Sequence, residues 1–79
     1  MDNSGKRIGQ LLTAKTLGQI LSLSKRQIFR LNKCGKIPAP IRIGGSLRWS
    51  QKEISAWLEV GAPDRKTFEN MMRAGILHV

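Results

Sequence analysis

The stretch from Ser24 to Trp49 most strongly constrains how this chain can fold. It begins with a serine, and Gln27 follows three residues later, which is the pattern of an N-terminal capping box. Gly35 suits the left-handed residue after a helix. The prolines in 37–40 cannot continue a helix, because proline lacks a backbone donor and fixes φ. The pattern predicts a short helix over residues 25–34, followed by an extended link.

The predicted helix has one apolar side and one basic side. Its apolar side chains recur at three-residue steps, at Ile28, Leu31 and Cys34, so we expect a narrow stripe packed on the core, with Cys34 as a small buried side chain. The basic residues fall mostly off that stripe. They are Lys25, Arg26, Arg30 and Lys33.

Two short runs after the link, 41–43 and 47–49, alternate between apolar side chains and arginine. Successive residues of a strand point to opposite faces. With 44–46 as the turn, we expect the four apolar side chains to share one face on the helices, because a lone hairpin is marginally stable. Arg42 and Arg48 should then share the outward face.

The charge of the chain is high and unevenly distributed. The net charge is +9, and residues 3–52 contain eleven Lys and Arg but no Asp or Glu. Residues 53–79 contain four acids and three bases. A one-signed field of this kind favours a polyanionic partner over a surface charged only for solubility.

Length and composition exclude several classes of protein. Seventy-nine residues predict one small domain. One cysteine and one histidine exclude a disulfide framework and a zinc site, so we expect no metal and no cofactor. No apolar run reaches the ~20 residues of a membrane span, and we find no signal peptide, so we expect a cytoplasmic setting. Catalysis is not expected, because the basic region offers no carboxylate.

Helices are also predicted on both sides of this stretch. Thr13 is an N-cap candidate for a helix over 14–21, in which Gly18 suggests a close crossing with the next helix. The apolar side of this first helix is Leu17, Ile20 and Leu21. Ser50 and Glu53 form another capping-box pattern, for a helix reaching about residue 59. Its apolar residues are Ile54, Trp57 and Leu58.

Two aromatic positions leave alternatives open. Trp49 lies on the apolar strand face and is expected in the core, and the alternative is stacking on a base. A last helix begins near Asp64 and carries Phe68, Met71 and Met72 at helical spacing. These three either pack back on the core or bind a partner protein, where methionine-rich surfaces are common.

The order of these elements resembles a known family. It consists of a helix, a turn, a basic helix capped by Ser24, Gly-Lys-Ile-Pro at 35–38, and the 41–44 and 47–49 runs. It is similar to the small winged helix-turn-helix proteins of the AlpA and excisionase type, related to the MerR DNA-binding domain. The resemblance runs from about residue 12 to 58. Thr16 departs from the pattern, because such proteins often carry an acidic residue there.

The resemblance implies a mainly α fold with a small β-hairpin wing, a MerR-like winged helix-turn-helix. We expect an N-terminal arm over 1–10, the DNA-binding domain over 11–61, and a C-terminal helix and tail over 62–79. In such proteins the second helix enters the major groove. The expected DNA-binding residues are Ser24, Lys25, Arg26, Gln27, Arg30 and Lys33 on the helix, and Lys36, Arg42, Ser46 and Arg48 on the loop and wing.

Within this set, Arg26, Gln27 and Arg30 are the candidates for reading bases, although Gln27 cannot fully serve both its cap and a base. The expected partner is double-stranded DNA, with an integrase or adjacent copies of the chain as further partners, and no small-molecule substrate. The expected function is that of a prophage or mobile-element excisionase that bends DNA. The alternative is an AlpA-like transcriptional regulator without a recombination role. RNA binding is disfavoured, because exposed aromatic platforms are lacking.

Overall fold

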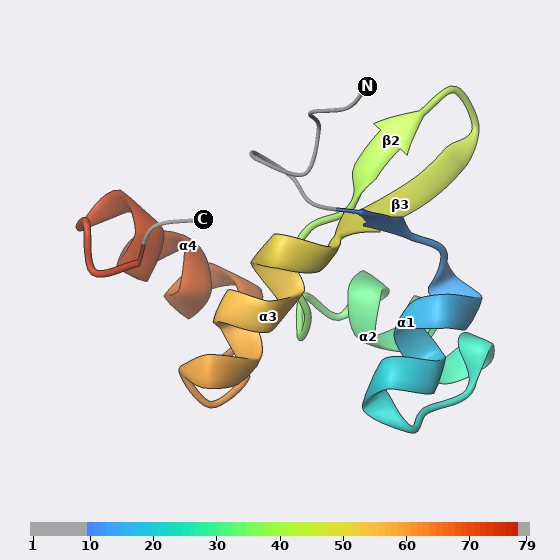
Figure 1. The fold of residues 1–79 in the computed structure, drawn as a ribbon, viewed down its shortest axis with the longest axis horizontal. Coiled ribbons are helices and arrows are strands. Elements are labelled where there is room, and N and C mark those ends of the chain that lie inside the picture. The colour runs from blue at the N-terminus through green and yellow to red at the C-terminus, as the bar shows by residue number, and fades with distance from the viewer. Residues whose placement is uncertain (1–9, 78–79) are drawn as a thin grey trace.

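The computed structural model describes residues 10–77 and contains four short helices around a small three-stranded antiparallel sheet (Figure 1). The expected N-terminal arm, except Gln10, lies outside the described residues. The predicted fold class, mainly α with a hairpin wing on a helix-turn-helix, is confirmed. The elements are β1 (Leu11–Leu12), α1 (Ala14–Leu21), α2 (Lys25–Lys33), β2 (Ile41–Ile43), β3 (Ser46–Ser50), α3 (Gln51–Glu59) and α4 (Arg65–Arg73).

The first two helices begin as their sequences predict. The Thr13 hydroxyl accepts the Thr16 N–H at 3.1 Å and donates to the Thr16 hydroxyl at 3.1 Å, so Thr16 supports the cap where related proteins often have an acid. At α2, the Ser24 hydroxyl accepts the Gln27 N–H at 3.1 Å. The Gln27 side-chain oxygen accepts the Ser24 N–H at 2.8 Å, which completes the capping box.

The corner between α1 and α2 depends on a glycine. The Leu23 N–H donates to the Gly18 carbonyl at 2.7 Å. A Cβ at Gly18 would lie 2.5 Å from the Leu23 carbonyl oxygen. The predicted close approach is therefore confirmed, although the contact is made by the connecting turn more than by the next helix.

One hydrophobic core draws on all four helices and on β1 and β3. Trp49 is fully buried, and its indole N–H donates to the Pro38 carbonyl at 3.0 Å, so it packs in the core and does not face a base. Phe68 of α4 is also fully buried, which favours packing over partner binding for this side chain. The core residues are Leu12, Ala14, Leu17, Ile28, Ile37, Trp49, Ile54, Trp57 and Phe68.

Three side chains expected in apolar stripes are exposed. Cys34 is exposed, because residues three apart on a helix are rotated by about 60° from each other, and two such steps from Ile28 leave the buried side. Ile20 and Leu58 lie in the last turns of their helices, each about 100° from a better-buried neighbour in sequence. Their exposed fractions are 46% and 43%.

The expected division of the hairpin into an apolar face and an arginine face is wrong. The turn contains only Gly44 and Gly45, and β2 pairs with β3 so that Arg42 lies opposite Leu47 and Ile41 opposite Arg48. Directly opposed residues of antiparallel strands share a face. The two arginines therefore lie on opposite faces, and the isoleucines of β2 are exposed. A turn one residue shorter than expected moved every side chain of β2 to the other face.

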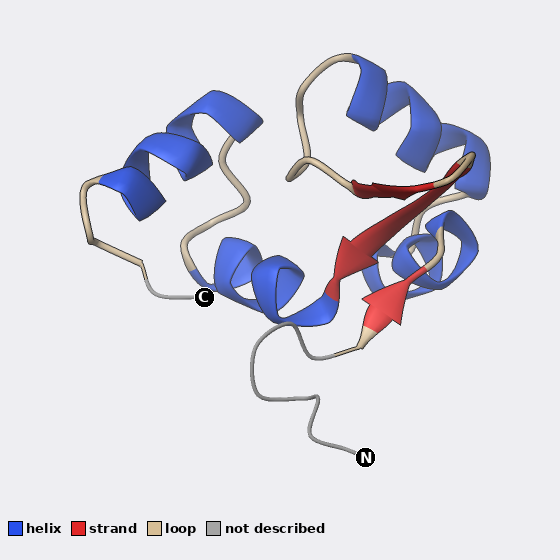
Figure 2. Ribbon diagram, turned by 90° about the horizontal axis from the view of Figure 1, so that it is seen from above, coloured by secondary structure: helices blue, strands red, loops and turns tan. Residues whose placement is uncertain are grey.

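The strand β1 was not predicted from the sequence. Leu11 pairs with Ser50 and Leu12 with Trp49, which places β3 in the centre of the sheet. Two residues are too short to show the alternation by which strands are recognised. Because β1 holds the base of β3 beside the helices, the β2–β3 turn extends away from them as a wing (Figure 1). Figure 2 shows the long strand β3 between the two shorter strands.

Candidate nucleic-acid interface

The exposed side of α2 is continuous and basic. Its five exposed residues recur at spacings i, i+1, i+4, i+5 and i+8, which places them within an arc of about 140°. They are Lys25, Arg26, Phe29, Arg30 and Lys33, called here the α2 outer face. Ile28 is fully buried on the opposite side. The sequence prediction of a helix docked by one side and basic on the other is confirmed, with Phe29 as an addition.

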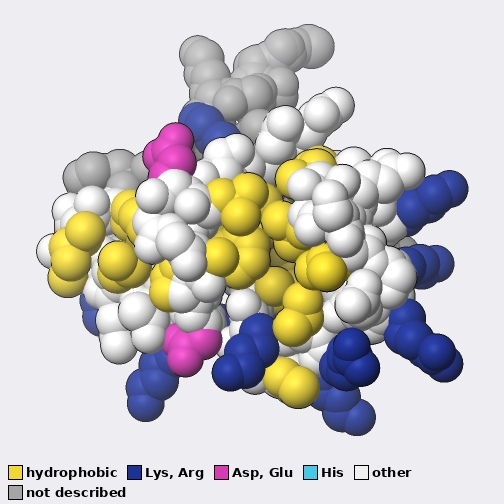
Figure 3. All heavy atoms as spheres, turned by 90° about the horizontal axis from the view of Figure 1, so that it is seen from below, with side chains coloured by type: hydrophobic (Ala, Val, Ile, Leu, Met, Phe, Trp, Pro, Cys, Tyr) yellow, Lys and Arg dark blue, Asp and Glu magenta, His cyan; other side chains and the backbone are white. Residues whose placement is uncertain are grey.

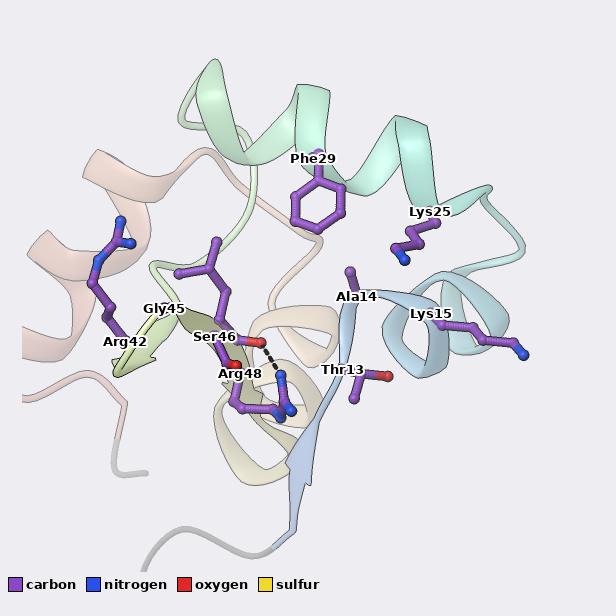
Figure 4. A pocket seen from close by; sticks show the side chains of 10 residues that line it. Thr13, Ala14, Lys15, Lys25, Phe29, Arg42, Gly45, Ser46 and Arg48 are labelled. Atoms are coloured by element: carbon purple, nitrogen blue, oxygen red, sulfur yellow. Dashed lines mark hydrogen bonds between the residues drawn. The ribbon is translucent and has the colours of Figure 1, made fainter.

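The α2 outer face borders an open groove of about 430 Å³ (Figure 4). The groove lies between α2, the start of α1 and the wing. It brings together four of the predicted residues from two distant segments, Lys25 from α2 and Arg42, Ser46 and Arg48 from the wing. The Arg48 guanidinium donates to the Leu47 carbonyl at 2.8 Å, which restrains it along the strand.

Sequence reasoning missed three residues that line the same groove, namely Thr13, Lys15 and Phe29. Lys15 lies in the first turn of α1 and borders the groove, with its side chain extending outward from it (Figure 4). The sequence could have suggested a role for Lys15, because the first helix of a helix-turn-helix crosses the DNA backbone and a lysine at its start could contact a phosphate. Phe29 lies outside the expected apolar stripe and was given no role, and its exposure contradicts the expectation that exposed aromatic side chains are lacking.

The remaining predicted residues lie outside the groove. Arg26, Arg30 and Lys33 are exposed on the α2 outer face, and Lys36 is exposed in the link after α2. The four acidic residues of residues 10–77 all fall at or after Glu53. Figure 3 shows Lys and Arg dense along the right and lower margins, while the visible acids lie on the left half. The segregation of charge in the sequence therefore persists in space.

The capping box at the start of α2 limits two of the predicted contacts. The Gln27 side chain is half-buried and its oxygen is already bonded to the Ser24 N–H. Bidentate recognition of adenine requires both the oxygen and the nitrogen of a Gln side chain, so it would compete with the cap. Ser24 is exposed, and its hydroxyl keeps a donor for a phosphate after accepting from Gln27.

Arg65, the first residue of α4, binds the C-terminal end of α2 and the link that follows it, and sequence reasoning missed it. Its guanidinium donates to the Ile37 carbonyl at 3.0 Å and to the side-chain and main-chain oxygens of Asn32 at 2.7 and 3.2 Å. Its backbone N–H donates to the Gly35 carbonyl at 3.0 Å. A cation at a helix C-terminus meets unpaired carbonyls and the negative end of the dipole. We call this set of contacts the Arg65 clasp.

The acids of α3 and α4 form a contrasting region. Burial raises the pKa of the Glu53 carboxyl, and repulsion from Glu69 raises it further. Asp64 caps α4, where bonds from the backbone and side chain of Thr67 lower the pKa of its carboxyl. Met71 and Met72 of α4 are half-buried, so they keep some exposed surface.

Within residues 10–77, no three His, Cys, Asp or Glu side chains are grouped so that they could hold a metal ion. No helix in this described part of the chain has the length and apolar character needed to span a membrane.

Comparison with known proteins gave one informative result. Searches of curated proteins and of solved structures returned no match. Residues 10–61 match the family model described as "Prophage CP4-57 regulatory protein (AlpA)". The match runs from β1 through α3 and includes α2 and the wing, about two thirds of the chain, and it ends before α4. The chain therefore belongs to the AlpA family of prophage regulatory proteins, which bind DNA.

Proposed function

We propose that this protein regulates a prophage or related mobile element by inserting α2 in the major groove of duplex DNA, with the wing on the adjacent minor groove or backbone. The observation that carries the proposal is the α2 outer face, which joins the groove shared with the wing and contains no acid. A surface charged only for solubility would be expected to mix acids among the bases, and the α2 outer face and the groove contain none.

The residues divide by their positions. Arg26 and Arg30 project from the α2 outer face and read base edges, where arginine pairs bidentately with guanine. Lys25, Lys33 and Lys36 bind phosphates from the two ends of the helix. Arg42 and Arg48 bind the backbone from the two faces of the wing, with Ser46 at its tip. Ser24 donates to a phosphate, and Gln27 serves chiefly the cap.

The test compares specific and random DNA. A duplex selected by the wild-type protein from a random pool is titrated in parallel with an unselected duplex. Arg30→Ala is expected to lose about 1–3 kcal/mol on the selected duplex and much less on the other, because a base contact carries sequence preference. The matched control is Arg73→Ala, an exposed arginine on α4. Absence of duplex binding by the wild type, or equal losses from both variants, would contradict the proposal.

A second candidate function is that of an excisionase, which biases an integrase toward excision by bending DNA. It is favoured by the size of the interface. Apart from Lys15 of α1, the basic residues that border the groove or lie beside it belong to one short helix, the link after it and one hairpin, so a protomer offers DNA a small surface. Adjacent copies would supply affinity by avidity and share the cost of deforming the duplex. The family match gives priority to regulation.

The two functions are separated by stoichiometry, bend angle and recombination. A circular-permutation assay on the native site, with the number of bound protomers measured alongside, should give several protomers and a bent duplex for an excisionase. Purified integrase should then yield excision products only when the protein is added. A straight duplex, unchanged excision and altered transcription of a neighbouring gene would leave regulation alone.

A further inference from the structure

We propose that Phe29 reads the 5-methyl group of a thymine in the major groove, and so determines sequence specificity. The proposal rests on the DNA-binding function proposed above. It assigns a base contact to a residue that carries no charge and no hydrogen-bonding group, in the middle of a surface otherwise made of lysine and arginine.

The placement of Phe29 is the first observation behind this proposal. Exposed apolar side chains are ordinary on protein surfaces, so its exposed fraction of 42% decides nothing alone. Within the α2 outer face, however, Lys25 precedes it and Lys33 follows it by four residues, and Arg30 is adjacent. Phe29 is thus the single apolar member of this face, flanked by cations on the same side of the helix.

The side chain is also aimed toward the groove. Phe29 projects from α2 toward the wing, and it lines the groove together with Lys25, Arg42 and Arg48 (Figure 4). The neighbouring Ile28 is fully buried and Leu31 packs against the core, so α2 is docked by residues other than Phe29. An apolar ring between cations that bind phosphates would be brought against base edges when α2 enters the groove.

The chemistry of the major groove identifies what the ring would contact. Base pairs display hydrogen-bond donors and acceptors there, and the thymine methyl is the apolar group among them. A phenyl ring cannot satisfy a donor or acceptor, so facing guanine or cytosine would leave polar edges desolvated. Phe29 therefore favours a thymine at its position and disfavours bases without the methyl.

The experiment removes the methyl and the ring separately. Each thymine of the selected duplex is replaced in turn by deoxyuridine, which lacks only the 5-methyl group. At one or two positions the wild type should bind about fourfold more weakly, the loss expected for one buried methyl-sized group. In Phe29→Ala the same replacement should have no effect. Leu58→Ala, which truncates a side chain of matched exposure (43%) on α3, should keep the full methyl effect.

Each outcome decides the proposal. Phe29→Leu provides a second variant that retains apolar bulk, and the wild-type titrations need no variant at all. If no thymine shows a methyl effect in the wild type, or if the effect persists in Phe29→Ala, the proposal is overturned. In either case binding to the selected duplex would still stand. If the wild type selects no sequence at all, the DNA-binding function fails first, and the thymine contact with it.

Discussion

The helices α2 and α4 are alike in construction and opposite in use. Each has nine residues, a side-chain N-cap and one fully buried residue, Ile28 or Phe68. In α2 the four cations all remain exposed, and no acid is present. In α4 the first cation, Arg65, is turned inward, and Glu69 opposes the charge. What distinguishes the two helices is therefore where the cations point, not how well each sequence forms a helix.

The two helices also differ in what each does for the domain. The family match includes α2 and ends before α4, yet the Arg65 clasp connects α4 to the C-terminus of α2. In this chain α4 thus supports α2 at its C-terminal end. Substitutions in α4 should lower the stability of the domain, and they should weaken DNA binding only indirectly, through α2. Substitutions on the basic surface should weaken DNA binding and leave the stability nearly unchanged.

The largest effect is expected from Phe68→Ala. This fully buried ring joins α4 to the common core, and truncating a core phenylalanine typically costs about 3–5 kcal/mol. Urea denaturation followed by circular dichroism should show a correspondingly lower midpoint. Met71→Ala, at a half-buried position of the same helix, is the control and should cost clearly less. Equal, small losses from both would mean that α4 is only loosely attached.

A smaller loss, about 2 kcal/mol, is expected when Arg65→Ala removes the clasp, because three carbonyl-type oxygens lose a charged donor. Arg65→Lys should restore little of it, since an ammonium cannot reproduce the guanidinium fork. Both stability and affinity for the selected duplex should be measured. Arg73→Ala is the control, because the Arg73 guanidinium donates to Asn70 of its own helix. If Arg65→Ala behaves like Arg73→Ala, the clasp does not support α2.

The wing should affect affinity without affecting stability. Replacing Arg42 and Arg48 together by alanine is expected to weaken binding to every duplex and to reduce the slope of log K against log salt by about 0.9 for each phosphate that is no longer neutralised. With about six phosphates neutralised, the wild-type slope should be near −5. The control is Lys66→Ala combined with Arg73→Ala, which removes two exposed cations from α4. The idea fails if the wing variant leaves the slope unchanged.

Local patterns predicted most of the fold. The N-caps Thr13, Ser24 and Ser50 and the glycine at the α1–α2 corner depend on neighbouring residues, and these predictions were confirmed. The helical period placed most of the apolar residues, but not Ile20, Cys34 and Leu58, which are exposed. The error in the hairpin arose because Gly44, Gly45 and Ser46 all suit a turn, and alternation alone does not say which of them belong to it. One residue in the turn then decided the face of Ile41 and Ile43.

The candidate interface was predictable in its charges and not in its assembly. Lys25 and Arg42 were identified as basic residues, but their meeting in one groove depends on the tertiary arrangement of α2 and the wing. The Arg65 clasp spans twenty-eight residues to Ile37, and no local pattern indicates an arginine that bonds carbonyls at that distance. Phe29 was missed because it belongs neither to the expected apolar stripe nor to the basic residues of the helix, and its place beside the wing depends on the tertiary structure.

The smallest predicted effect concerns pH and again separates the two helices. The N-cap of α2 is a neutral serine, whereas the N-cap of α4 is the charged Asp64. In addition, Glu69 of α4 lies near Glu53 of α3 and repels its negative charge. Because burial and Glu69 raise the pKa of Glu53 above its ordinary 4.5, the folded state favours the protonated carboxyl. The stability this provides is present in acid and is lost as the pH rises through the raised pKa, so at neutral pH the charged Glu53 is destabilising.

Glu53→Gln should therefore raise the free energy of unfolding at pH 7, by less than about 1 kcal/mol because the group is half-exposed and screened by solvent. The gain should shrink as the pH falls through the raised pKa of Glu53, and it should be close to zero below 4.5, where the carboxyl is protonated in both the folded and the unfolded state. The contribution of Asp64 to stability depends on pH in the opposite direction. Its pKa is lowered in the folded state, so its stabilising contribution is lost as the pH falls through that lowered value. Urea titrations of wild type and variant across this pH range isolate Glu53 in their difference, since Asp64 contributes equally to both. A difference that stayed constant with pH would show that the substitution acts through packing or the helix cap, not through the charge shared with α4.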